Sequence, residues 1–199
     1  YLVFDESDKV AMLVDAPPDP DRIGQVALDL GVSIGAVLLT HGHIDHIGGS
    51  GQIAKRFDSQ VFVHPDDDFL TLHPVEQATR MFGFLPPGSY EVPDEISALE
   101  DGQNLDLAGF SVEVRQTPGH TPGHCCFYLA EQETLFSGDQ LFAGSVGRTD
   151  LPGGSTAALL ESMAARVLTL DDQVRVLPGH GDETTIGWER TTNPFLQNL

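Results

Sequence analysis

The chain has 199 residues, a length typical of one compact domain that buries its own apolar core. Ten basic and thirty acidic residues give a formal net charge of −20, which argues against nucleic acid and anionic membrane surfaces as partners. No apolar run approaches the roughly 20 residues of a membrane-spanning helix, and no signal-peptide pattern opens the chain. We therefore expect a single domain over residues 1–199, a cytoplasmic location and a small-molecule partner.

The first part of the sequence alternates strands with a helix. Residues 1–4 and 10–14 are short apolar runs around a polar turn, which predicts two strands. Asp19 is a typical helix cap and Pro20 fits the first helical position. Apolar residues then recur at intervals of three and four, which predicts a helix that ends at Gly31.

The next apolar run, residues 36–39, predicts a buried strand. A helix over residues 51–57 and a strand over residues 61–64 follow in the expected order. The segment 65–93 has no clear period, and prolines and a glycine at 86–88 indicate a loop within it.

The second half of the sequence is richer in strands. Residues 110–116 alternate apolar and polar side chains, and residues 125–129 and 134–137 form two more apolar runs around a polar turn. Ser155 then caps an expected helix, and residues 174–177 predict a last strand. Strands and helices in this order predict one mixed α/β domain.

The densest group of polar residues follows the buried strand at residues 36–39. It holds His41, His43, Asp45 and His46 within six positions. So many ionisable side chains beside a buried strand are costly as packing, whereas imidazole and carboxylate are good ligands for zinc and similar metals. In a loop, the alternate spacing would direct His41 and His43 to one ion and Asp45 and His46 to another.

Three later strands end in the same way. His120, Asp139 and His180 each follow an expected strand and each has a glycine beside it. A glycine lets backbone and metal approach closely, and strand ends are rigid supports for functional loops. Each of these turns is weak support alone, but together they extend the predicted metal site.

The order of these motifs resembles that of the metallo-β-lactamase fold superfamily. The motifs are Thr-His-x-His-x-Asp-His, then Pro-Gly-His, then Ser-Gly-Asp and then a second Pro-Gly-His. Within this superfamily, residues 144–154 and 178–187 resemble compact bacterial glyoxalase II enzymes, also called hydroxyacylglutathione hydrolases. The resemblance implies an α/β fold, an αββα sandwich of two mixed β-sheets flanked by helices.

The resemblance also implies two divalent metal ions, most naturally zinc, although iron and manganese accept the same ligands. The implied ligands are His41, His43 and His120 for the first metal, Asp45, His46 and His180 for the second, and Asp139 as a bridge.

Two such metals can share one water and lower its pKa towards neutrality, and the hydroxide then attacks a thioester carbonyl. The implied substrate is S-lactoylglutathione or a related hydroxyacyl thioester, with Asp45 and Asp139 as the catalytic carboxylates. By the same resemblance Arg148 binds the substrate, with an ion pair to Asp150 as the alternative. Asp15 either orients a ligand histidine or serves as a turn residue.

Two other functions fit the same motifs. A persulfide dioxygenase of the superfamily would hold a single iron with His41, His120 and Asp139, and another hydrolase, such as a lactonase or β-lactamase, would use the full set. A non-catalytic protein on this fold would lack ligands, but all seven residues are present.

The remaining histidines and the two cysteines have no place in this ligand set. His64, His73 and His124 match no ligand position and are expected to be structural or exposed. Cys125 and Cys126 are neighbours in an expected strand, so they point to opposite faces and are expected to pack in the core without forming a disulfide.

Overall fold

The computed structural model describes residues 1–197 and 199, and the chain folds into two compact units. The first unit comprises Tyr1–Leu99 and Asp106–Phe110, and the second comprises Glu100–Leu105 and Ser111–Leu199. Each unit holds the larger part of one sheet and has its own apolar core.

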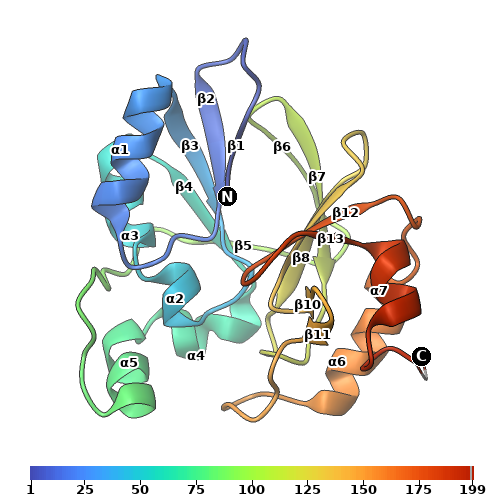
Figure 1. The fold of residues 1–199 in the computed structure, drawn as a ribbon. Helices are drawn as coiled ribbons and strands as arrows, with labels where there is room; N and C mark the ends of the chain where they lie inside the picture. The colour runs from blue at the N-terminus through green and yellow to red at the C-terminus, as the bar shows by residue number, and fades with distance from the viewer. Residues whose placement is uncertain (198) are drawn as a thin grey trace. The chain divides into compact units, whose positions relative to one another are not determined.

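A five-stranded mixed sheet forms the centre of the first unit (Figure 1). Its strands, in spatial order, are β1 (Leu2–Phe4), β2 (Val10–Val14), β3 (Ser33–Leu38), β4 (Gln60–Val63) and β5 (Ser97–Ala98). β1 pairs antiparallel with β2, and all other pairs are parallel. The carboxyl ends of β2, β3 and β4 therefore lie at the same edge of the sheet, where parallel sheets place their binding sites.

Two helices, α1 (Pro20–Leu30) and α3 (Ser50–Phe57), lie on the same side of this sheet (Figure 1). The predicted caps of α1 are confirmed: the Asp19 side chain accepts from the Arg22 amide, and Gly31 ends the helix with a left-handed φ of 70°. Apolar residues of both helices and of the strands form the first core.

Short helices replace the loops expected at the carboxyl edge of the sheet. α2 (Ile44–Ile47) carries Asp45 and His46, so the expectation that the whole histidine motif lies in a loop is wrong. The Gly48 amide donates to the Ile44 carbonyl and closes this single turn. The segment without a clear period forms a 3₁₀ turn (Pro65–Asp67), α4 (Asp68–Thr71) and α5 (Pro74–Phe82).

The second sheet is also mixed and has six strands. Their spatial order is β13 (Thr184–Thr185), β12 (Arg175–Pro178), β9 (Thr134–Gly138), β8 (Cys125–Leu129), β7 (Phe110–Gln116) and β6 (Asn104–Leu107). β12 runs parallel to β9, whereas β9, β8 and β7 pair antiparallel. A small hairpin, β10 (Leu141–Phe142) and β11 (Ser145–Val146), follows β9.

The helices of the second unit are α6 (Thr156–Ser162), which continues as a π-helix over Met163–Val167, and α7 (Ile186–Thr192). Ser155 caps α6 as predicted, because its side chain accepts from the Ala158 amide. Cys125 and Cys126 are buried free thiols, which confirms their expected place in the core. Burial raises the pKa of Cys126 to about 12.

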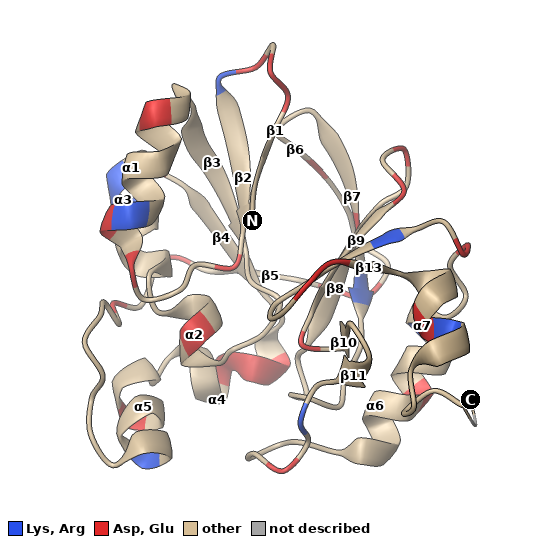
Figure 2. Cartoon of the chain, in the orientation of Figure 1, with Lys and Arg blue, Asp and Glu red and all other residues tan. Residues whose placement is uncertain are grey.

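Charged residues lie on helices and loops of both units, and acidic positions far outnumber basic ones (Figure 2). Within residues 1–197 and 199, no helix has the length and apolar character that crossing a membrane requires.

Candidate metal centre

The first unit brings together the four ligand candidates that follow β3. The ring centroid of His41 lies 4.8 Å from that of His43 and 4.1 Å from that of His46. Nε2 of His46 is 3.6 Å from Oδ2 of Asp45. The three histidines are buried, whereas the Asp45 side chain is 51% exposed. The unit thus presents three imidazoles and one carboxylate at the carboxyl edge of its sheet.

Hydrogen bonds that Asp15 accepts determine which ring nitrogens of His41 and His46 are left to face a ligand. The Thr40 amide and hydroxyl both donate to the Asp15 carboxylate, at 2.8 and 2.9 Å, and Nδ1 of His46 lies 2.8 Å from Oδ2 of Asp15. Because the Thr40 hydroxyl has its one hydrogen on Asp15, Nδ1 of His41, 3.0 Å away, must donate to Thr40 Oγ1. In both histidines Nδ1 carries the proton, and Nε2 is the ring nitrogen left to bind a metal ion if one is present.

Asp15 itself follows β2 directly and has a left-handed φ of 60°. Its amide donates to the Leu38 carbonyl at 2.9 Å, which joins the end of β2 to the end of β3. Asp15 thus contacts His46, one of the predicted ligands, as well as ending β2.

Side chains of the α4–α5 region hold the backbone around His43. The Gly42 amide donates to Asp67 Oδ2 at 2.8 Å, the Ile44 amide donates to Gln77 Oε1 at 2.9 Å, and the Gln77 amide group donates back to the Gly42 carbonyl. A Cβ at Gly42 would lie 2.7 Å from the Leu70 side chain, so glycine is required for this close packing. Sequence reasoning missed Asp67 and Gln77, because they lie 25 and 33 positions from their partners.

The second unit brings together the other three candidates. Oδ2 of Asp139 lies 3.5 Å from Nε2 of His120 and 3.8 Å from Nε2 of His180. His120 and Asp139 are buried, whereas the His180 side chain is 56% exposed. Nδ1 of His120 donates to the Arg148 carbonyl at 2.7 Å, so Nε2 is again the ring nitrogen that could bind a metal ion.

Gly147 makes this arrangement possible. A Cβ at this position would lie 1.8 Å from the Asp139 carbonyl oxygen and 3.3 Å from Nδ1 of His120. No other residue type fits at that distance, so position 147 requires glycine for a steric reason.

A buried hydrogen-bond chain supports the backbone of Asp139. The Asp139 amide donates to Nε2 of His124 at 3.0 Å, so Nδ1 of His124 carries the proton and donates to Thr117 Oγ1 at 2.8 Å. The Thr117 hydroxyl lies 3.3 Å from Cys126 Sγ, and that thiol donates to the Ser137 carbonyl. His124 is thus structural, as expected, and its ring nitrogens are both used within the protein.

Arg148 forms the ion pair that was the alternative to substrate binding. Its Nε and Nη2 donate to the two carboxylate oxygens of Asp150 at 2.7 and 2.8 Å, which lowers the pKa of Asp150 to about 2. Both side chains are more than half exposed, so the pair contributes little stability. Its role in substrate binding stays a prediction.

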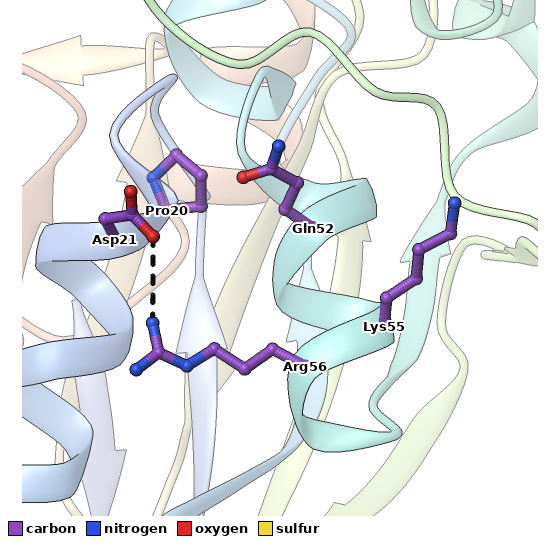
Figure 3. Close-up of a pocket in the computed structure, with 5 residues that line it drawn as sticks. All are labelled: Pro20, Asp21, Gln52, Lys55 and Arg56. Atoms are coloured by element: carbon purple, nitrogen blue, oxygen red, sulfur yellow. Dashed lines mark ion pairs between the residues drawn. The ribbon is translucent and has the colours of Figure 1, made fainter.

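Two surface cavities lie away from the predicted ligands of the first unit. One, of about 320 Å³, lies between α1 and α3, where Arg56 and Asp21 face each other with Nη1 and Oδ1 4.0 Å apart (Figure 3). Lys55 beside it pairs with Glu91. The other, of about 500 Å³, adjoins α5 and is lined partly by apolar side chains.

The donor atoms in both units are suited to a divalent metal. Each unit offers Nε2 atoms of imidazoles whose Nδ1 is held by the protein, next to a carboxylate oxygen. Nitrogen and oxygen donors of this kind bind zinc, iron and manganese. The two thiols are not among them, because Cys125 and Cys126 bond to backbone carbonyls of the core.

Comparisons with known proteins place the chain in a family. Residues 1–180 match the model of the metallo-beta-lactamase superfamily, and the chain belongs to this superfamily. It is 36% identical over 197 residues to the hydroxyacylglutathione hydrolase GloC of Haemophilus influenzae, covering 99% of this chain and 92% of that protein.

Two solved structures have the same fold over nearly the whole chain. The B3 metallo-beta-lactamase BLEG-1 has a TM-score of 0.89 and 33% identity, covering 99% of this chain and 93% of that one. TTHA1623, solved in a di-iron-bound form, has a TM-score of 0.87 and 40% identity, covering 98% and 93%. The predicted fold class, the α/β metallo-β-lactamase fold with two mixed sheets and flanking helices, is therefore confirmed.

Proposed function

We propose that the protein is a metal-dependent hydrolase that cleaves thioesters of small carboxylic acids. The observation that carries this proposal is the protonated Nδ1 of His41, His46 and His120, which leaves Nε2 of each ring beside a carboxylate or another imidazole. Similarity to the GloC hydrolase of Haemophilus influenzae supports the thioester as the substrate class.

The residues that would hold two divalent metals are His41, His43, Asp45, His46, His120, Asp139 and His180. When bound, the metals would supply an activated water at neutral pH and an electrophile for the carbonyl oxygen. The protein residues keep the imidazoles of His41, His46 and His120 in one tautomer and one orientation, which lowers the cost of assembling the site. Asp45 and Asp139 supply the negative charge that balances the metals. A thiolate leaves readily, so the mechanism requires no protein acid at the sulfur.

The activity is tested by assaying purified protein loaded with zinc, iron or manganese. We expect hydrolysis of S-lactoylglutathione, which is monitored as a decrease in the thioester absorbance. Elemental analysis should find up to two metal ions per chain. The same samples are given glutathione persulfide in an oxygen electrode. Oxygen consumption with one iron per chain, and no thioester cleavage, would overturn the proposal in favour of the dioxygenase.

Arg148 is expected to bind an anionic group of the substrate by exchanging its partner Asp150 for a substrate carboxylate. Arg148→Ala should raise KM for S-lactoylglutathione by about tenfold, the value of one charge-assisted hydrogen-bonded contact, with kcat changed much less. Asp150→Asn leaves the guanidinium without its competing carboxylate and should lower KM. Steady-state kinetics of both variants decide the matter, and an unchanged KM in both assigns the pair a purely structural role.

A further inference from the structure

One short segment of the second unit, residues 139–148, is in contact with all the predicted ligands of that unit, and we call it the ligand segment. It begins with the predicted ligand Asp139, and its last carbonyl accepts from Nδ1 of His120 at 2.7 Å. Between these ends, the hairpin of β10 and β11 brings the ring of Phe142 into an edge contact with His180, with the ring centroids 6.2 Å apart. The conformation of the ligand segment therefore determines where these donor atoms lie.

The hairpin within the ligand segment is too short to fix its own geometry. β10 and β11 comprise two residues each, and an isolated two-stranded hairpin is marginally stable in water even when its strands are longer. Gln140 holds the start of the segment, because its amide group donates to the Leu159 carbonyl and to Ser162 Oγ, each at 3.0 Å. The hairpin turn and the residues after it need a second attachment.

That attachment comes from α7, which belongs to the same unit (Figure 1). The Gly144 amide donates to Oε2 of Glu189 at 2.8 Å, and the Asn193 amide group donates to the Ser145 carbonyl at 3.0 Å. The Asn193 amide group also donates to Oε2 of Glu189 at 2.8 Å, and the Thr184 hydroxyl donates to Oε1 at 2.6 Å. Glu189 and Asn193 are fully buried, so both bonds to the hairpin are shielded from water.

Burial of the Glu189 carboxylate has a cost that packing alone does not require. Among residues 1–197 and 199, the donors to this carboxylate are uncharged: a backbone amide, a carboxamide and a hydroxyl. An apolar side chain of the same size would fill the space without the loss of hydration, but it could not accept from the Gly144 amide. A carboxylate accepts from several donors and has no proton of its own to place. The chemistry of residue 189 thus suits the group that it holds.

We propose that Glu189 and Asn193 are positioning residues of the metal centre. By holding the hairpin turn they keep the last carbonyl of the ligand segment on Nδ1 of His120, which leaves Nε2 of that ring for the metal. The connection is short, because only Val146 and Gly147 separate Ser145 from the residue that supplies this carbonyl. The inference rests on the metal centre of the proposed function and not on the thioester, so it can hold where the substrate is another.

The test replaces Glu189 in two ways. Glu189→Ala removes all three hydrogen bonds, so we expect His120 to populate both tautomers and zinc to bind about tenfold more weakly, the lower end of the range for partners of ligand histidines. Glu189→Gln can keep its oxygen on Gly144 and Asn193 while its amide donates to the Thr184 hydroxyl, which accepts as well as donates. We therefore expect Glu189→Gln to retain the wild-type tautomer and zinc affinity.

The two readouts and the control do not depend on catalysis. Long-range nitrogen–proton NMR correlation on the metal-free protein gives the tautomer of His120, and competition with a chromophoric chelator gives the zinc affinity. The matched control is Arg190→Ala on the same helix, because Arg190 bonds to the carbonyls of Leu168 and Leu170 and to Asp172, all outside the ligand segment. It should lower the free energy of unfolding in urea and leave the tautomer and zinc affinity unchanged.

Asn193→Ala is the second variant, and it replaces Glu189→Ala if that variant does not fold. It removes one of the two bonds to the ligand segment, so we expect the same change of tautomer with a smaller loss of zinc affinity. An unchanged tautomer or an unchanged zinc affinity in the folded variant overturns the inference, as does an equal loss in Arg190→Ala or in Glu189→Gln. If no thioester is cleaved but both readouts change as expected, the proposed function fails and the positioning role stands.

Discussion

Asp139→Ala is expected to abolish thioester hydrolysis and to reduce the bound metal to at most one ion per chain. The Asp139 carboxylate lies between Nε2 of His120 and Nε2 of His180, at 3.5 and 3.8 Å, so its removal takes away the anionic oxygen that both rings face. A contribution of several kcal/mol to transition-state charge stabilisation corresponds to a loss of about 10³-fold or more in kcat/KM. Elemental analysis and single-turnover hydrolysis measure the two effects.

Asp171→Ala is the control for this variant, because Asp171 is an exposed aspartate of the same unit and its backbone carbonyl, not its side chain, is used in a turn. It should keep wild-type metal content and activity. Circular dichroism shows that both variants are folded. Hydrolysis by Asp139→Ala at the wild-type rate, with two metals retained, would contradict the dinuclear site.

Asp15→Asn is expected to weaken metal binding by about 10- to 100-fold, the range found when the partner of a ligand histidine is changed. The asparagine oxygen can still accept from the Thr40 amide, and asparagine tolerates the left-handed φ of 60° at this position. Its amide group, however, would face Nδ1 of His46 as a donor, because the two acceptor oxygens of Asp15 bond to Thr40 and His46. His46 would then shift its proton to Nε2 and lose its metal-binding atom.

Two measurements distinguish this positioning role from a merely structural one. Competition with a chromophoric chelator gives the metal affinity, and urea unfolding of the metal-free protein gives the stability. We expect the stability of Asp15→Asn to change by no more than about 1 kcal/mol, the net value of one hydrogen bond. Asp15→Ala loses the same contacts and adds backbone strain, so it should lose both affinity and stability. Equal affinity in the wild type and Asp15→Asn would exclude the role.

The ligand candidates could be predicted because several side chains that can bind a metal lie close together in the sequence or recur in similar turns. His41, His43 and His46 lie within six positions, and His120 and His180 recur beside glycines at strand ends. Strands β1 to β4 and helices α1 and α3 of the first unit could also be predicted, because apolar periodicity and, for α1, the caps are local signals.

The supports of the ligands could not be predicted in the same way. Gln77 and Asp67 act on residues 33 and 25 positions away, and only the parallel pairing of β3 with β4 brings their segments together. α5 is amphipathic, but its apolar residues Val75, Met81 and Phe82 are exposed, so this apolar face does not mark a buried side of the helix. The Arg148 carbonyl that orients His120 has no signal in the sequence, because any residue type could supply it.

The high pKa of the buried Cys126 thiol has a consequence for the proposed thioester hydrolysis, which would release a thiol. Exchange between a disulfide and a protein cysteine needs the cysteine as a thiolate, and at pH 7 a group with a pKa of about 12 is ionised in about one molecule in 10⁵. Cys125 and Cys126 are also shielded from solvent, so a disulfide formed from a released thiol finds no accessible protein thiolate to attack it. We therefore expect the proposed activity to persist in the presence of disulfides, although the chain carries two cysteines in the strand that leads away from His120.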